Sequence, residues 1–179
     1  MIYSYKELKA LNNQKQIKKL LETKELFRIE KGYYSDRKHY DNLELITKKY
    51  PNAIFTAESA FFYWGLTDYI PDKYYLATAN NIKSIQDDNI KQFFITNDFF
   101  EIGKTKLNYN GVEINIYDKE RMLIELAKNK NIIAYDYYKE LIIIYRNILE
   151  DLDISKLAKY LKHFKNGDNI LETIHREVF

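Results

Sequence analysis

The first 38 residues carry the pattern that most restricts how this chain can fold. An apolar helical edge over residues 8–11 is interrupted by Asn12-Asn13, and a second edge opens at Ile17 with the i, i+3, i+4 spacing of a helix. Residues 26–31 (LFRIEK) then alternate with the period of two that is typical of a strand, and Gly32 permits a tight turn. A short helix, a break, a second helix and a hairpin in this order predict a winged helix-turn-helix.

Charge is divided unevenly along the chain. Residues 1–38 contain 10 Lys or Arg against 5 Asp or Glu, whereas the remaining residues contain 18 against 21. A basic segment on an acidic body favours a phosphate-binding surface. A run of lysines alone usually forms a solvated helix face. The prediction of DNA binding therefore depends on the coincidence of this charge with the helix break and the hairpin.

The second helix of a helix-turn-helix enters the major groove, so we expect DNA contacts there and on the hairpin. Gln16 and Lys15 are expected to read base edges, and the other cations to bind phosphates. The expected DNA-binding residues are Lys15, Gln16, Lys18, Lys19, Arg28 and Lys31. Arg37 and Lys38 either contribute or belong to a linker. Because only about ten residues precede the break, the segment lacks one helix of a full three-helix module.

The pattern changes after residue 38, and we place a second domain over residues 39–179. Strand-like runs are expected at 53–55, 74–78, 91–96 and 99–102, with a hairpin over 107–117 marked by Asn110-Gly111. Helices are expected at 43–50, 57–64 (capped by Thr56), 119–128 (started by Asp118), 135–149, 156–164 and 169–178. The predicted fold class is α+β. A winged helix over 1–38 is followed by a mixed α/β domain, with a mixed sheet over about 53–117 and a helical bundle over 118–179.

Several kinds of chemistry have no support in the sequence. The chain has no Cys, and its three His are far apart, which removes disulfides, thiol catalysis and the usual metal-ligand spacings. It has no Gly-rich phosphate loop, and its acidic runs at 87–88 and 150–153 fall where solvated charges are expected. We therefore expect no enzyme, no cofactor and no metal. With no apolar signal core or membrane-length apolar run, we expect a cytoplasmic protein without a membrane partner.

Residues 117–126 (YDKERMLIEL) contain one unusual charge. Glu120 suits the positive start of a helix, whereas Arg121 is electrostatically unfavourable so close to that end. Arg121 should therefore have a partner, either a sheet carbonyl or a carboxylate such as Glu58 or Asp68. We interpret it as an ion-paired tether between the helix and the sheet.

Four motifs in order give the chain a resemblance to the AbiEi family, the antitoxins of bacterial type IV (abortive infection) toxin–antitoxin systems. They are the LFRIEKGYY hairpin, the central block KYPNAIFTAESAFFYWGLTDYIP, the YDKERMLIEL helix start with Glu120 and Arg121, and the closing stretch KELIIIYRNILEDLDISKLAKYLKHF. The chain departs from the family pattern at Met122, where Thr is usual, and at Glu125, where Asp is usual.

The resemblance implies a protein in two parts. Its amino-terminal part would bind repeats in its own promoter DNA and repress the operon. Its body would neutralise a nucleotidyltransferase-like toxin, for which a stable complex is not required. Two alternatives stay open. One is a plain winged-helix transcriptional regulator without antitoxin activity. The other is a body that modifies the toxin enzymatically, with Glu120, Arg121 and nearby acids involved.

Overall fold

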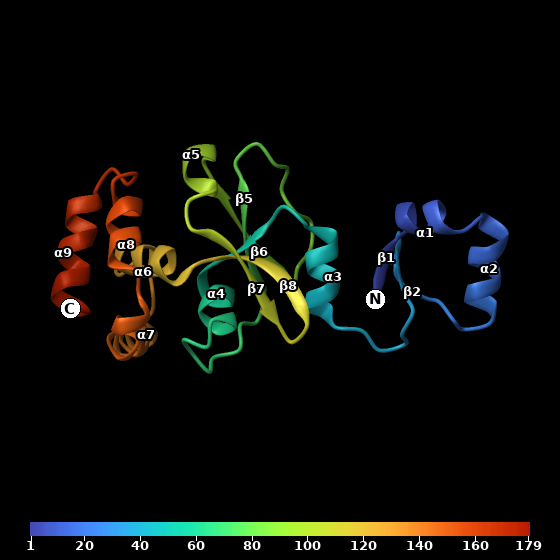
Figure 1. Ribbon diagram of the computed structural model, residues 1–179, viewed down its shortest axis with the longest axis horizontal. Helices are drawn as coiled ribbons and strands as arrows, with labels where there is room; N and C mark the ends of the chain where they lie inside the picture. Colours follow the sequence, from blue (N-terminus) through green and yellow to red (C-terminus); the bar gives the residue numbers. More distant parts are fainter. The chain divides into compact units, whose positions relative to one another are not determined.

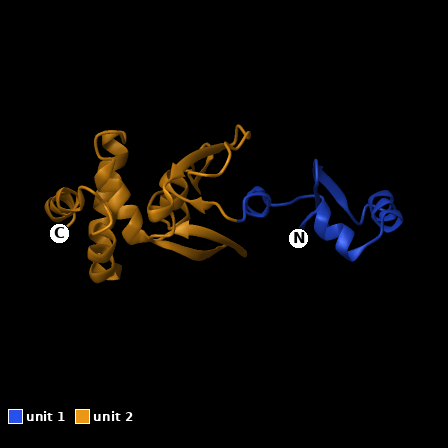
Figure 2. Ribbon diagram, turned by 90° about the horizontal axis from the view of Figure 1, so that it is seen from above, with its two compact units in different colours: residues 1–51 blue, residues 52–179 orange.

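The computed structural model describes residues 1–179 and divides them into two compact units, Met1–Pro51 and Asn52–Phe179 (Figure 2). The boundary expected at residue 38 is therefore too early. Helix α3 (Asn42–Lys49) belongs to the first unit because it is bonded to the amino-terminal elements. The Ile2 amide donates to the Glu44 carboxylate at 2.9 Å, and the Lys48 ammonium donates to Glu7 at 2.5 Å.

The first unit has a three-stranded antiparallel sheet and three helices (Figure 1). Its elements in order are β1 (Ile2–Ser4), α1 (Tyr5–Leu11), α2 (Gln14–Glu22), β2 (Phe27–Glu30), β3 (Tyr33–Ser35) and α3. The strand order is β1-β3-β2, so the second strand of the expected hairpin also pairs with a strand at the chain's beginning. Strand β1, which was not expected from the sequence, pairs with the second edge of β3.

Side-chain caps explain why α1 and α2 are separate helices. Ser4 and Glu7 form a capping box at the start of α1, and Asn13 and Gln16 form a second one at the start of α2. Between the two helices, Asn12 has extended backbone torsions (φ −141°, ψ 148°). The predicted break at Asn12-Asn13 is confirmed, because each helix begins with its own cap.

The core of the first unit is small. One buried cluster consists of Leu8, Ile17 and Leu26, one from each of α1, α2 and the approach to β2. The other buried apolar side chains of the unit are Ile2 of β1 and Leu43, Leu45 and Ile46 of α3. Leu11 was expected to share the apolar edge of Leu8, but 71% of its surface is exposed. Helix α3 therefore contributes buried apolar side chains to the unit, and its ion pairs with Glu7 and Glu30 add further tertiary contacts.

A mixed five-stranded sheet forms the middle of the second unit. Its strands are β4 (Ile54–Phe55), β5 (Tyr74–Ala79), β6 (Ile90–Ile95), β7 (Lys104–Tyr109) and β8 (Val112–Tyr117), in the order β6-β5-β4-β8-β7. The β5–β6 and β4–β8 pairs are parallel, and the other pairs are antiparallel. The predicted hairpin is confirmed: Tyr109 pairs with Val112, and the two loop residues Asn110 and Gly111 both have positive φ.

The helices of the second unit gather mainly after the sheet, where α6 to α9 lie together in Figure 1. They are α4 (Ala57–Tyr63), α5 (Asn97–Phe100), α6 (Lys119–Lys128), α7 (Tyr135–Asn147), the 3-10 helix η1 (Leu149–Asp151), α8 (Ile154–Leu161) and α9 (Gly167–Glu177). The predicted combination of a mixed sheet with later helices is confirmed. None of these helices, nor any in the first unit, has the length and apolar character needed to cross a bilayer.

Two local predictions in the second unit are wrong. No strand forms at 99–102: residues 99 and 100 belong to the short helix α5, and residues 101–103 form a bend and a turn. Thr56 occupies the N-cap position of α4, but its side chain makes no capping hydrogen bond. The Thr56 hydroxyl is buried and lies 3.9 Å from the sulfur of Met122, so packing against α6 replaces capping.

The contact between α1 and α3 predicts a pH dependence of stability. Hydrogen bonds from Lys48, which has the largest effect, and from Ser4 lower the pKa of Glu7 from 4.5 to about 2. Because the folded-state pKa is depressed, the stabilisation is complete above pH 4.5 and is lost as the pH falls toward 2. We expect Glu7→Gln to lower the melting temperature at neutral pH and to match the parent chain near pH 2.

Thermal melts of both proteins across this pH range measure the effect. Glu22→Gln is the matched control, since the pair between Glu22 and Lys18 is 3.8 Å long and solvent-exposed. A constant difference between Glu7→Gln and the parent from neutral pH to pH 2 would contradict the ion-pair explanation.

Candidate nucleic-acid interface

Helix α2 presents a basic face, which we define as Lys15, Lys18 and Lys19. All three side chains are exposed, whereas Ile17 on the same helix is buried in the core of the first unit. The burial of Ile17 fixes the rotation of the helix, so the basic face is held toward solvent. Lys18 makes a long, exposed pair with Glu22, and neither Lys15 nor Lys19 makes an ion pair. These two lysines are therefore free to bind phosphates.

Gln16 is exposed as expected, but its side chain already has a partner. Its Oε1 atom accepts a hydrogen bond from the Asn13 amide at 2.7 Å, and its own amide donates to Asn13 Oδ1 at 2.9 Å. A glutamine that reads adenine uses its oxygen and its nitrogen together. Of the polar groups in the Gln16 side chain, only the Nε2 amide donors have no hydrogen-bond partner. In this structure Gln16 therefore serves to cap α2.

The β2–β3 hairpin places two further cations in solvent. Arg28 lies on β2 opposite Tyr34, and Lys31 lies at the tip beside Gly32, whose φ is +88°. Neither Arg28 nor Lys31 makes an ion pair, and both side chains are exposed. Gly32 accepts the conformation required at this tight turn, which keeps the hairpin short.

Arg37 and Lys38 differ in their surroundings. The Arg37 guanidinium donates to Glu44 of α3 at 3.0 Å and lies 3.5 Å from Asp36. Lys38 is exposed and has no ion pair. Arg37 thus helps to hold α3 within the first unit, whereas Lys38 remains in the connecting segment.

The carboxylates of the first unit are largely neutralised away from the basic face. The unit contains 12 Lys or Arg and 7 Asp or Glu. Four of its acids pair with cations outside α2 and the hairpin tip: Glu7 with Lys48, Glu30 with Lys49, Glu44 with Arg37, and Asp36 with the amino terminus. The excess positive charge is therefore concentrated on α2 and the hairpin, where a polyanion can approach it.

The second predicted motif, Glu120 and Arg121, lies inside the second unit. Arg121 is only 1% exposed, and its guanidinium donates to the carbonyls of Phe99 and Ile102 at 3.2 and 3.4 Å. Its carboxylate partner is Glu125, at 2.8 Å, rather than Glu58 or Asp68. The expectation that Arg121 has a carboxylate and carbonyl partners is confirmed, but the predicted ion pair between the helix and the sheet is wrong. The ion pair lies within α6, and the two carbonyls belong to α5 and the turn that follows it.

Glu120 is also buried and joins α6 to α8. Its Oε1 atom accepts from the Asp153 amide at 2.9 Å, and Lys156 lies 3.5 Å from Oε2. Lys156 in turn pairs with Asp118 at 2.7 Å. Burial and the hydrogen bond to Asp118 raise the pKa of Tyr160 to about 12, so this phenol is neutral at physiological pH. These contacts give the motif a structural role within the unit.

No protein-family model matches the chain, and no curated protein is significantly similar to it. No group of three or more His, Asp and Glu side chains is arranged to hold a metal ion.

The packing around Arg121 predicts an unusual sensitivity at Gly103. A Cβ atom at Gly103 would lie 2.4 Å from Arg121 Cβ, and the φ of Gly103 is +77°. We expect Gly103→Ala to lower the free energy of unfolding by about 1–3 kcal/mol more than Gly111→Ala does. Gly111 has a similar φ of +86° with no atom within 4 Å of an added Cβ, so this control separates the clash from backbone strain.

Urea unfolding of both variants, monitored by circular dichroism, measures the two free energies. Equal losses in Gly103→Ala and Gly111→Ala would show that the close approach to Arg121 is unimportant.

Proposed function

We propose that the first unit is a winged helix-turn-helix that binds double-stranded DNA through α2 and the β2–β3 hairpin. The observation that carries this proposal is the set of exposed cations without ion pairs on these two elements, Lys15, Lys19, Arg28 and Lys31. A surface of this kind binds phosphates, because it gains interactions without breaking existing ion pairs. The strand, two helices and hairpin of the unit support the winged-helix assignment.

The same unit can make only a few contacts with one DNA segment. Specific affinity from a module of this size requires two copies on two half-sites one helical turn, or a multiple of it, apart. Promoter repeats, which the AbiEi resemblance implies, would provide such half-sites. We therefore propose that the chain represses a promoter by binding it in pairs.

We further propose that the chain is the antitoxin of a type IV system and neutralises a nucleotidyltransferase-like toxin. This part of the proposal rests on the four motifs that resemble the AbiEi family. The burial of Glu120 and Arg121 supports a structural role for the shared helix start, so contacts that act on the toxin would involve other residues. A plain transcriptional regulator is the alternative function.

Salt dependence provides the test of DNA binding. We expect log Kd for a promoter fragment to vary linearly with log salt, because bound Lys and Arg release counterions from phosphates. Lys19→Ala should weaken binding to all sequences alike and reduce the slope by about one unit. Fluorescence anisotropy with labelled duplexes at several salt concentrations measures both quantities.

Lys162→Ala is the control for that experiment, since it removes the same charge from an exposed position in the second unit. An affinity that does not change with salt, or an equal loss in Lys162→Ala, would exclude the proposed interface.

Growth rescue provides the test of antitoxin function. We expect the full chain, co-expressed with the toxin gene next to its own, to restore growth. A full-length variant with Lys15→Gln, Lys19→Gln and Lys31→Gln should rescue as well at matched protein levels, because these exposed residues lie outside the second unit. Colony counts after toxin induction measure the rescue.

If the parent chain binds DNA but does not restore growth, the antitoxin proposal is wrong and the plain transcriptional regulator is the function that remains. Protection by far less antitoxin than toxin would instead favour an enzymatic mode of neutralisation.

A further inference from the structure

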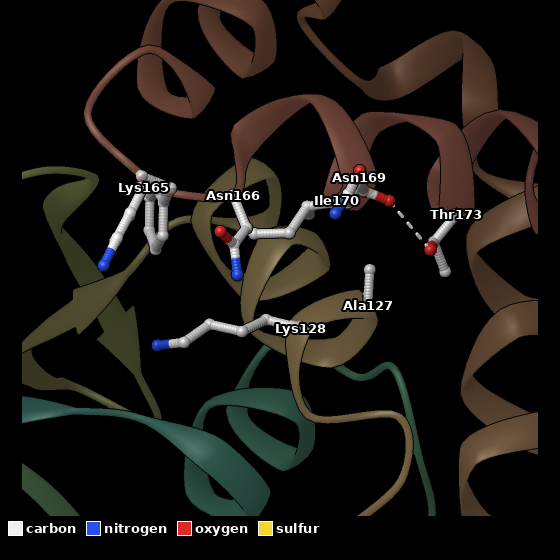
Figure 3. A pocket seen from close by; sticks show the side chains of 8 residues that line it. Ala127, Lys128, Lys165, Asn166, Asn169, Ile170 and Thr173 are labelled. Carbon is white, nitrogen blue, oxygen red and sulfur yellow. Dashed lines mark hydrogen bonds between the residues drawn. The ribbon is translucent and has the colours of Figure 1, made fainter.

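A pocket of about 290 Å³ lies in the second unit between the end of α6 and the start of α9 (Figure 3). Its apolar wall includes Ala127 from α6 and Ile170 from α9. Its polar lining comes from three segments and consists of Lys128, Lys165, Asn166 and Asn169. In Figure 3 the side chains of Lys128, Lys165 and Asn166 extend to one side of the pocket, with Ala127 and Thr173 on the other.

The polar groups of this pocket have few partners within the protein. Lys165 makes no ion pair, and the side-chain amides of Asn166 and Asn169 make no hydrogen bond. Lys128 is paired with Glu125, at 3.4 Å, and its ammonium lies 5.6 Å from the centre of the Phe164 ring. The same carboxylate lies closer to Arg121, at 2.8 Å. The pocket thus contains the ammonium of Lys165 and two carboxamides without a side-chain partner, beside the ammonium of Lys128, which is paired.

The shape of the pocket mouth is fixed by the backbone. A Cβ atom at Gly167 would lie 2.3 Å from the carbonyl oxygen of Leu161, so α9 can begin here only because the residue is Gly. The Gly167 amide also donates to the carbonyl of Phe164 at 3.0 Å. This close turn fixes the backbone between α8 and α9, in the segment that carries Lys165 and Asn166.

We propose that this pocket binds a small phosphate monoester with an apolar or planar body. A phosphate monoester carries a charge of about −1.5 to −2 at neutral pH, which matches the two lysines. The Asn166 carboxamide can donate a further hydrogen bond to a phosphate oxygen, and the body of the ligand would cover Ala127 and Ile170. This site is separate from the DNA-binding residues and does not depend on the proposed function.

A nuclear magnetic resonance titration of the ¹⁵N-labelled full chain with phenyl phosphate tests the proposal. We expect saturable shifts of amides in residues 127–128 and 165–173, and no saturable shift with phenol, which lacks the phosphate. Asn166→Asp should weaken binding at least tenfold by placing a negative charge in the pocket. Because Asp is among the best N-cap residues, this variant should keep its melting temperature.

Lys165→Gln provides a second variant, since the exposed side chain can change without loss of folding. It should weaken binding severalfold, whereas Lys162→Gln, outside the pocket, should not. A variant with Lys15→Gln and Lys19→Gln should bind phenyl phosphate as the parent does, which distinguishes this pocket from the basic face of α2. The absence of saturable shifts up to about 10 mM ligand would overturn the proposal. Unchanged affinity in both Asn166→Asp and Lys165→Gln would do the same.

Discussion

The buried guanidinium of Arg121 joins three parts of the second unit at one point. A buried charge is tolerated only when it is paired and hydrogen-bonded, and the two terminal nitrogens of Arg121 bond to Glu125 and to the carbonyls of Phe99 and Ile102, whereas its buried Nε has no hydrogen-bond partner. The rings of Tyr117 and Phe164 lie against it, each 4.9 Å from the guanidinium carbon. The helix α6 is thereby fixed to the end of β8 and to the segment before α9. Lys128 bonds the other oxygen of the same carboxylate, at 3.4 Å, and its ammonium lies 5.6 Å from the centre of the Phe164 ring.

Helix α3 has a comparable role in the first unit. The first unit has three helices, and the third, α3, comes from the residues that follow the hairpin. Its lysines and Glu44 pair with groups on α1, β2 and the connecting segment. These pairs extend a small core and also neutralise the acids that would otherwise weaken the field of α2. One set of contacts therefore contributes to both stability and the positive surface.

The features that sequence predicted well are those determined locally. Asn110-Gly111 specifies a two-residue hairpin by its backbone preferences, and Asn13 begins α2 by capping it. The features that sequence missed depend on distant contacts. Strand β1 forms because β3 is available to pair with it, and the Thr56 hydroxyl turns toward Met122 instead of capping α4. The need for a partner at Arg121 could be inferred from helix electrostatics. Its carbonyl partners, Phe99 and Ile102, could not, because they depend on how α5 and the following turn pack against α6.

The two roles of Gln16 limit how the proposed interface can discriminate among DNA sequences. Its oxygen accepts from Asn13, and a bidentate contact with adenine would compete with the cap that starts α2. Losing that cap would destabilise the helix that carries the basic face. Sequence discrimination then falls on Lys15, on the hairpin and on the shape of the DNA, while most of the affinity comes from phosphates. A single copy of such an interface would discriminate poorly among DNA sequences. Two copies on two half-sites would add the spacing of the sites as a source of selectivity, and repeated sites therefore suit the proposed interface.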